Sequence, residues 1–322
     1  MAYLQVIAGL VLLLVSGDYL VRGAASIATR AGISKLVVGL TIVAFGTSAP
    51  EMVVGIDAVV SGAPTLALGN IVGSNIANVL LVLGFPALIT PICCNVPRIG
   101  RNLLLMLGAT LLFISLACFD IINWVHGLIL LSCFVLFLLY SAVKAKAGME
   151  NDPSFEIGFE EIPQNPDSYG FATILVLGGL LGISIGANIL VSGSVTIARD
   201  FEIPEEVIGL TLVALGTSLP ELATSLMAAI RKHSDVAIGN VIGSNIFNIL
   251  AIMAVSSLFG DIPVPPSFLS VDMWVMLGSG LILVPYCYKS LSIGRVSGLV
   301  MLALYGAYMF YLASNSVLAS PL

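Results

Sequence analysis

The sequence contains one stretch of residues twice: LTIVAFGTSAPE at 40–51 and LTLVALGTSLPE at 210–221. A second motif follows each copy, as GNIVGSNIAN at 69–78 and GNVIGSNIFN at 239–248. Both pairs are separated by 170 residues, because 221 − 51 and 248 − 78 each equal 170. The repeat predicts that the chain consists of two copies of one structural unit.

The composition predicts an integral membrane protein. Hydrophobic residues make up 58% of the 322 residues and charged residues only 9%, whereas a soluble domain has about 25% charged residues. So little polar surface indicates that the protein faces a lipid bilayer. The 12 Lys and Arg residues form no basic cluster, so we expect no nucleic-acid partner.

Apolar segments of the length needed to cross a bilayer occur ten times. A transmembrane helix needs about 20 apolar residues. The candidate spans are 4–28, 36–60, 66–90, 102–118, 123–142, 171–198, 206–230, 236–258, 270–288 and 296–315. We therefore predict an all-α polytopic membrane protein with ten transmembrane helices.

Basic residues predict the orientation of these spans. Ten of them fall in alternate loops or beside them: Arg30, Lys35, Arg98, Arg101, Lys144, Lys146, Arg231, Lys232, Lys289 and Arg295. Because cytoplasmic loops carry an excess of Lys and Arg, these loops are predicted to be cytoplasmic. We expect both termini outside, in the cell (inner) membrane.

The chain divides at its long polar segment. Residues 1–143 form the first predicted five-helix repeat, 144–170 a cytoplasmic acidic linker, and 171–322 the second repeat. The linker acids lack the regular spacing and glycine of a calcium loop, which favours a solvated linker over a regulatory calcium site. An odd number of spans per repeat inverts the second copy, and inverted repeats are typical of secondary transporters with ion sites near the midplane.

The repeated motif predicts that helices 2 and 7 are broken. Pro50 has no N–H and leaves the carbonyl of Gly46 without its helical partner, and glycine lowers the cost of unwinding. Free carbonyls at this depth are tolerated only where they line a cavity or are buried in protein. Glu51 and Glu221 each cost about 2.5–3.5 kcal/mol at the bilayer centre on insertion scales. This cost favours a functional site over a purely structural role as protonated, hydrogen-bonded acids.

The GNxxGSNxxN motifs add further oxygen atoms. Ser74 and Asn78 are four residues apart and share a helix face, as do Ser244 and Asn248. The remaining motif amides, Asn70, Asn75, Asn240 and Asn245, are interpreted as packing or backbone-capping residues. Carboxylates, hydroxyls, amides and carbonyls are hard ligands that suit Ca²⁺ and Na⁺. We expect these to be transported ions, with no cofactor.

At these motifs the sequence resembles the calcium/cation antiporter superfamily, and within it the prokaryotic sodium/calcium exchangers. The resemblance spans essentially all ten segments. It implies Na⁺/Ca²⁺ exchange by alternating access, with the first and sixth spans sliding across a fixed core. It also implies one ion cluster of side-chain and backbone ligands: Thr47, Ser48, Glu51, Ser74, Asn78, Thr217, Ser218, Glu221, Ser244 and Asn248, with the carbonyls of Ala44 and Ala214.

One departure from the family bears on coupling. Some relatives, including the potassium-dependent branch, carry Asp where this chain has Asn248, so this site has one acid fewer. The placement of the acid after GTSxP favours sodium over protons. A proton/calcium antiporter using the same acids and a cation channel stay as alternatives. The spans contain no nucleophile–base pair or metal cluster, so an enzyme is not expected, and we expect a monomer to function.

Three other charged residues lie within the predicted spans. Asp18 and Arg22 are four residues apart and are interpreted as a structural ion pair rather than a coupling site. Asp57 follows Glu51 on the same helix. Two interpretations of Asp57 stay open: the side chain attracts cations to the entrance of the ion site, or it marks a solvated helix end.

Overall fold

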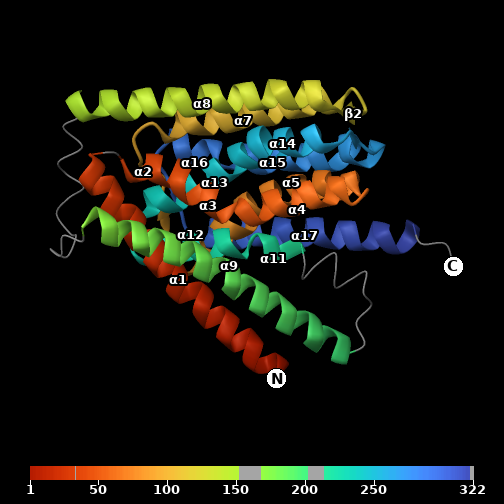
Figure 1. Cartoon of the computed structure of the whole chain (residues 1–322), viewed down its shortest axis with the longest axis horizontal. Coiled ribbons are helices and arrows are strands. Elements are labelled where there is room, and N and C mark those ends of the chain that lie inside the picture. The colour runs from red at the N-terminus through yellow and green to blue at the C-terminus, as the bar shows by residue number, and fades with distance from the viewer. Residues whose placement is uncertain (33, 152–167, 202–213, 320–322) are drawn as a thin grey trace.

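The computed structural model describes residues 1–32, 34–151, 168–201 and 214–319. This part of the chain is mostly helical. Figure 1 shows most helices lying side by side along one direction, with α1 and α9 crossing them obliquely as a pair.

The elements follow the predicted spans closely. Those before the linker are α1 Ala2–Ala31, α2 Lys35–Val38, η1 Gly39–Val43, α3 Ala44–Thr47, α4 Ala49–Val60, α5 Pro64–Ala77, η2 Asn78–Leu83, α6 Gly84–Ile89, β1 Ile92–Cys93, α7 Ile99–Ala117, β2 Ile121–Ile122 and α8 Trp124–Asn151. The η segments are single π-helical stretches within longer helices. Helix α8 continues into the segment predicted as linker, and the remainder of that linker, 152–167, lies outside the described residues.

The second half contains a similar series of elements. Its elements are α9 Tyr169–Asp200, α11 Ala214–Thr217, α12 Leu219–Ile230, α13 Ser234–Phe247, η6 Asn248–Ile252, α14 Met253–Phe259, β3 Ile262–Pro263, η7 Phe268–Asp272, α15 Met273–Ile282, α16 Val284–Tyr288, β4 Ser292–Ile293 and α17 Arg295–Ala319. The start of the predicted span 206–230 falls outside the described residues, which resume at Ala214.

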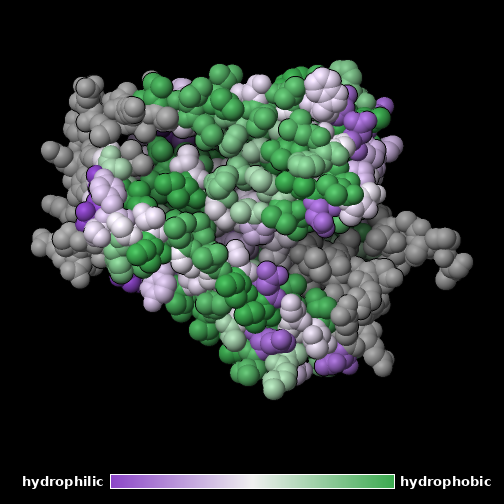
Figure 2. All heavy atoms as spheres, viewed as in Figure 1, coloured by the Kyte–Doolittle hydropathy of each residue, from purple (hydrophilic) through white to green (hydrophobic). Residues whose placement is uncertain are grey.

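Eight helices in the described part of the chain are long and apolar enough to cross a membrane. A ninth candidate is the bent pair Lys35–Thr47 and Ala49–Val60, whose axes differ by 44°. Large apolar side chains are exposed on these helices, among them Leu136 at 65% and Leu299 at 62%, and hydrophobic side chains cover most of the face in Figure 2. Such a surface requires lipid around it, so the protein is an integral membrane protein.

The bend in the second span lies where proline predicts it. Ser48 separates α3 from α4 and has φ −88° and ψ 8°, and Pro50 stands in the first turn of α4. Ser218 separates α11 from α12 in almost the same conformation, φ −88° and ψ 1°. Proline is tolerated in the first turn because the N–H groups there have no helical acceptor. Both copies of the motif therefore end one short helix and begin another.

Helices α1 and α9 are packed through glycines. A Cβ atom at Gly9 would lie 2.6 Å from the Leu190 nitrogen, and one at Gly186 would lie 2.9 Å from the Leu13 nitrogen. At Gly179 it would lie 2.8 Å from the Leu20 nitrogen. Small residues let helix backbones approach closely in membranes, so α1 and α9 form one tightly packed unit.

Loops distant in sequence meet through short strands. Strand β1 pairs antiparallel with β4, and β2 pairs antiparallel with β3. The Lys35 ammonium donates to His233 Nδ1 at 3.4 Å, and the Cys93 amide donates to Ser234 Oγ at 3.1 Å. The basic loops that the sequence places on one side thus lie in contact with one another.

Candidate functional site

The two broken helices bring their glutamates into one buried region. Glu51 lies in the first turn of α4 and Glu221 in the first turn of α12, with exposed fractions of 1% and 0%. The Ser48 hydroxyl donates to Glu221 Oε1 at 2.9 Å, so the break in one half contacts the acid of the other. The two carboxyl groups also interact electrostatically. A pair of buried acids this close favours a bound cation, because burial of uncompensated like charges is costly.

The remaining predicted side chains lie beside this pair or on the facing helices. Thr47 and Ser48 are buried, Ser218 is buried, and Thr217 is partly buried. On α5, η2, α13 and η6 the predicted residues are all buried to 4% exposure or less: Ser74, Asn78, Ser244 and Asn248.

The two predicted carbonyl ligands begin equivalent short helices. Ala44 is the first residue of α3, and its carbonyl accepts the Ser48 amide at 3.0 Å. Ala214 is the first residue of α11. A carbonyl oxygen has two lone pairs, so the hydrogen bond to the Ser48 amide leaves the Ala44 oxygen able to accept a second partner.

Several buried oxygen atoms in this region have no hydrogen-bond partner within the described part of the chain. They are Glu51 Oε2, Glu221 Oε2, Ser218 Oγ, Ser244 Oγ, Asn75 Oδ1, Asn78 Oδ1 and Asn248 Oδ1. Leaving a buried polar atom unsatisfied costs about 1–3 kcal/mol, and such atoms are rare in native proteins. Their concentration in the two repeated motifs indicates a cation site, because a cation satisfies many oxygens at once.

The donor set suits a hard cation. The described residues hold no group of three or more His, Cys, Asp or Glu side chains that could share a metal ion. Two carboxylates and several neutral oxygens are the ligands that Ca²⁺ and Na⁺ accept, and Ca²⁺ takes about 6–8 of them. The two negative charges can balance one Ca²⁺ or two Na⁺.

The structure assigns the motif asparagines a larger part than the sequence did. Asn75 bonds the backbone of its own helix, through Nδ2 to Ile71 O at 2.7 Å, inside α5 and not at a helix end. Asn245, in contrast, accepts from Asn78 Nδ2 at 3.0 Å and donates to Asn75 O at 3.2 Å.

Two further amides contact predicted ligands directly. Thr47 Oγ1 donates to Asn240 Oδ1 at 3.3 Å, and Thr217 Oγ1 donates to Asn70 Oδ1 at 3.4 Å. The sequence signal for these contacts is the recurrence of each asparagine at the 170-residue offset. The partner across the two halves is visible only in the folded chain.

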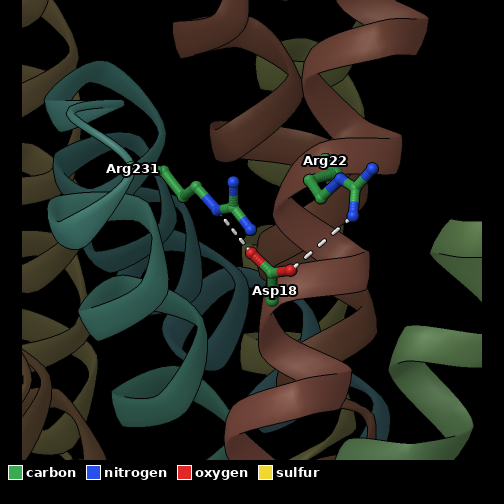
Figure 3. A network of polar contacts seen from close by, with 3 residues as sticks. All are labelled: Asp18, Arg22 and Arg231. Atoms are coloured by element: carbon green, nitrogen blue, oxygen red, sulfur yellow. Dashed lines mark hydrogen bonds and ion pairs between the residues drawn. The ribbon is translucent and has the colours of Figure 1, made fainter.

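Asp18 has a partner that helix spacing does not reveal. The predicted pair is present, with Arg22 Nη1 3.9 Å from Asp18 Oδ2. A closer ion pair joins Asp18 Oδ1 to Arg231 Nε at 2.6 Å. Figure 3 shows Asp18 on α1 between Arg22 of its own helix and Arg231 at the end of α12. Asp57, on α4, is exposed.

Comparison with known proteins finds the same family over nearly the whole chain. The family model described as sodium/calcium exchanger protein matches residues 1–143 and 171–313. The sodium/calcium exchanger MaX1 of Methanosarcina acetivorans is 35% identical over 343 aligned positions, covering 96% of this chain and 98% of MaX1. The inner membrane protein YrbG of Escherichia coli is 34% identical over 310 positions, covering 95% and 94%.

A solved structure shows the same fold. The sodium-calcium exchanger NCX_Mj, soaked with zero Na⁺ and Ca²⁺, superposes with a TM-score of 0.82 at 36% identity, covering 97% of this chain and 98% of NCX_Mj. With the family match, this places the chain among secondary transporters rather than enzymes and supports a cation/Ca²⁺ antiporter. The protein is a member of the sodium/calcium exchanger family.

Proposed function

We propose that the protein exchanges Na⁺ for Ca²⁺, with both ions held between the two broken helices. The observation that carries this proposal is the buried pair Glu51 and Glu221, together with buried oxygens of the same motifs that have no hydrogen-bond partner among the described residues. The names of MaX1 and NCX_Mj support sodium as the counter-ion.

The proposed ligands combine two charges with many neutral oxygens. Glu51 and Glu221 supply the charge. The neutral ligands are the side chains of Thr47, Ser48, Ser74, Asn78, Thr217, Ser218, Ser244 and Asn248 and the carbonyls of Ala44 and Ala214. Na⁺ and Ca²⁺ compete for overlapping members of this set, which couples release of one ion to binding of the other.

Coupling follows from the cost of an empty dicarboxylate. Two unneutralised acids resist any state that closes them off from water, because charge in a low-dielectric interior is expensive. An occupied site can switch its opening from one side of the membrane to the other, and an empty site cannot. This rule enforces exchange of ions and prevents a leak. We propose alternating access in which the α1–α9 unit moves across the remaining helices. Its separate glycine-mediated packing and its oblique course in Figure 1 support that motion.

The proposed architecture is ten spans in two inverted repeats, 1–143 and 171–322, joined by a cytoplasmic linker. Strand pairing supports it. The 170-residue offset relates β1 to β3 (92 + 170 = 262) and β2 to β4 (122 + 170 = 292). Strand β1 pairs with β4 and β2 with β3, so each repeat pairs its first strand with the second strand of the other. A two-fold relation between the repeats produces this reciprocal strand pairing.

We propose that a monomer is sufficient for transport and that the protein lies in the inner membrane.

The test is ⁴⁵Ca²⁺ uptake into proteoliposomes loaded with Na⁺ and diluted into Na⁺-free buffer. We expect uptake that requires the outward Na⁺ gradient and disappears when choline replaces internal Na⁺. Uptake driven only by a proton gradient would show that the counter-ion is the proton and not sodium. Uptake that needs no counter-ion at all would identify a channel.

A further inference from the structure

Two asparagines connect the halves of the molecule at the ion site. Asn240 on α13 accepts the hydroxyl hydrogen of Thr47 from the other half, and Asn70 on α5 accepts that of Thr217. Each asparagine thus contacts a threonine of the opposite repeat. Neither asparagine belongs to the proposed ligand set.

The chemistry of a hydroxyl ligand explains why such an acceptor matters. A hydroxyl that binds a cation uses an oxygen lone pair, so its single hydrogen has to point towards another acceptor. Thr47 Oγ1 has three neutral acceptors in reach, Val43 O at 3.1 Å, Ala44 O at 3.3 Å and Asn240 Oδ1 at 3.3 Å. The first two are the ordinary backbone acceptors of a helical threonine. The Thr47 hydroxyl also interacts with the Glu221 carboxylate, which is itself a proposed ligand. A hydrogen pointed at the Ala44 carbonyl occupies an oxygen that is itself a proposed ligand.

The Asn240 side chain is fixed in the orientation that this role requires. Its Nδ2 donates to Ser225 Oγ on α12 at 3.2 Å, which leaves Oδ1 as the atom that faces Thr47. Asn240 is fully buried. An amide held at its nitrogen and enclosed on all sides cannot rotate away when an ion enters or leaves.

We propose that Asn240 is a positioning residue for ion binding: its amide oxygen takes the Thr47 hydrogen, so that Thr47 and Ala44 present free oxygen lone pairs to the cation. The proposal rests on the proposed cation site. Asn240 touches no ion and acts through Thr47.

The corresponding contact in the other half is weaker. The Thr217–Asn70 distance is 3.4 Å, and among the described residues Asn70 Nδ2 donates to Glu51 O alone, at 3.5 Å. The residue equivalent to Ser225 is Gly55 (225 − 170 = 55), which has no hydroxyl to hold the amide. Asn70 is also only partly buried. Replacing Asn240 should therefore affect ion binding more than replacing Asn70.

A double-mutant cycle between Asn240 and Thr47 tests the proposal. The variants are Asn240→Ala, Thr47→Val and the two combined, assayed by Na⁺-driven ⁴⁵Ca²⁺ uptake and by the Ca²⁺-induced rise in Tm. We expect Asn240→Ala to raise the half-saturating Ca²⁺ concentration roughly three- to ten-fold, the size of one lost hydrogen bond, and to change the maximal rate less. In the Thr47→Val background it should have almost no further effect, because the hydroxyl it orients is gone.

Three further variants separate positioning from general structure. In the Thr47→Ser background, which keeps the hydroxyl, Asn240→Ala should retain its full effect. Ser225→Ala removes only the hydroxyl that holds the Asn240 amide and should raise the half-saturating Ca²⁺ concentration less than Asn240→Ala does. If Asn240→Ala fails to fold, Ser225→Ala is measured in its place. Asn102→Ala removes another buried amide, 6% exposed on α7, and should leave half-saturation unchanged.

The proposal is overturned if the Asn240 and Thr47 effects add, or if Asn240→Ala lowers only the maximal rate. Wild-type protein that takes up no Ca²⁺ under a Na⁺ gradient would contradict the proposed exchange instead. In that case the Ca²⁺-induced rise in Tm of the same variants still decides the role of Asn240.

Discussion

At the scale of single residues, the proposed exchange depends on two carboxylates that the protein buries at some cost. Glu51 and Glu221 are held at helix breaks and not in helix interiors. There, the first turn of α4 and of α12 also presents N–H groups and the positive end of a helix dipole to each acid. A negative charge is therefore better tolerated at these positions than elsewhere in a span.

Glu51→Gln and Glu221→Gln should each abolish Na⁺-driven ⁴⁵Ca²⁺ uptake. Each amide is nearly the same size as the acid, so the protein should still insert and fold, but half of the charge that balances Ca²⁺ is lost. The matched control is Asp57→Asn, which neutralises an exposed acid on the same helix as Glu51 and should retain uptake. Normal exchange in either glutamine variant would assign the acids a structural role.

His233 should make stability depend on pH. It lies between α12 and α13, where burial and then the charges of Lys35 and Arg231 lower its pKa to about 4. In the unfolded chain its pKa is about 6.5, so the unfolded state binds a proton first as the pH falls. Stability is therefore complete above about pH 6.5 and declines as the pH falls towards 4. Scanning Tm across this range in detergent should show the decline, and His233→Gln should reduce it; an unchanged profile would show that this histidine is not linked to folding.

At the scale of helices, glycines decide which elements act as a unit. Helix α1 contacts α9 through Gly9 and Gly186, where backbone atoms lie too close for a side chain. Between α1 and α12 the contact is looser: a Cβ atom at Gly17 would lie 3.1 Å from Ala223 O. Helix α1 is thus more tightly joined to α9 than to α12.

Gly186→Ala should destabilise the protein by about 1–3 kcal/mol, the usual cost of overpacking. The new methyl group would lie 2.9 Å from the Leu13 nitrogen and force α1 away from α9. Gly178→Ala on the same helix is the matched control, because among the described residues a Cβ atom there meets no atom within 4 Å beyond its own stretch of helix. Thermal unfolding in detergent compares the two; equal Tm values would show that the α1–α9 contact adapts freely.

The ion pair between Asp18 and Arg231 attaches the α1–α9 unit to α12 (Figure 3). Asp18→Asn should increase amide hydrogen exchange in α1, and high salt should have the same effect in the wild type. We expect a small free-energy change, about 1 kcal/mol or less, because the Arg231 side chain is 46% exposed. Arg22→Gln removes the longer contact of 3.9 Å and should change exchange less; the reverse order would make Arg22 the main partner.

At the scale of the whole molecule, the proposed arrangement of ten spans in two inverted repeats requires that the termini share one side of the membrane and that the linker lie on the other. Tags added at the N-terminus and the C-terminus should therefore be accessible to protease from outside intact spheroplasts. A tag inserted between residues 144 and 170 should be cleaved only after lysis. Accessible linker tags in intact cells would reverse the orientation, and termini on opposite sides would exclude ten spans.

The amino-acid sequence by itself determined the membrane class and most helix boundaries, and it supplied the residues proposed for the ion site. Those properties depend on the length of the apolar segments, on proline chemistry and on the 170-residue repeat. Such patterns are visible within a short segment or when the sequence is compared with itself. Only the tertiary structure decided which residues meet: Thr47 with Asn240, Asp18 with Arg231, and α1 with α9. These contacts join segments that are far apart in the chain. Periodicity within one helix shows which of its faces is apolar, but it carries no information about which other helix packs against that face. The physical reason is that hydrogen bonds and close packing act over a few ångströms in space, whatever the separation in sequence.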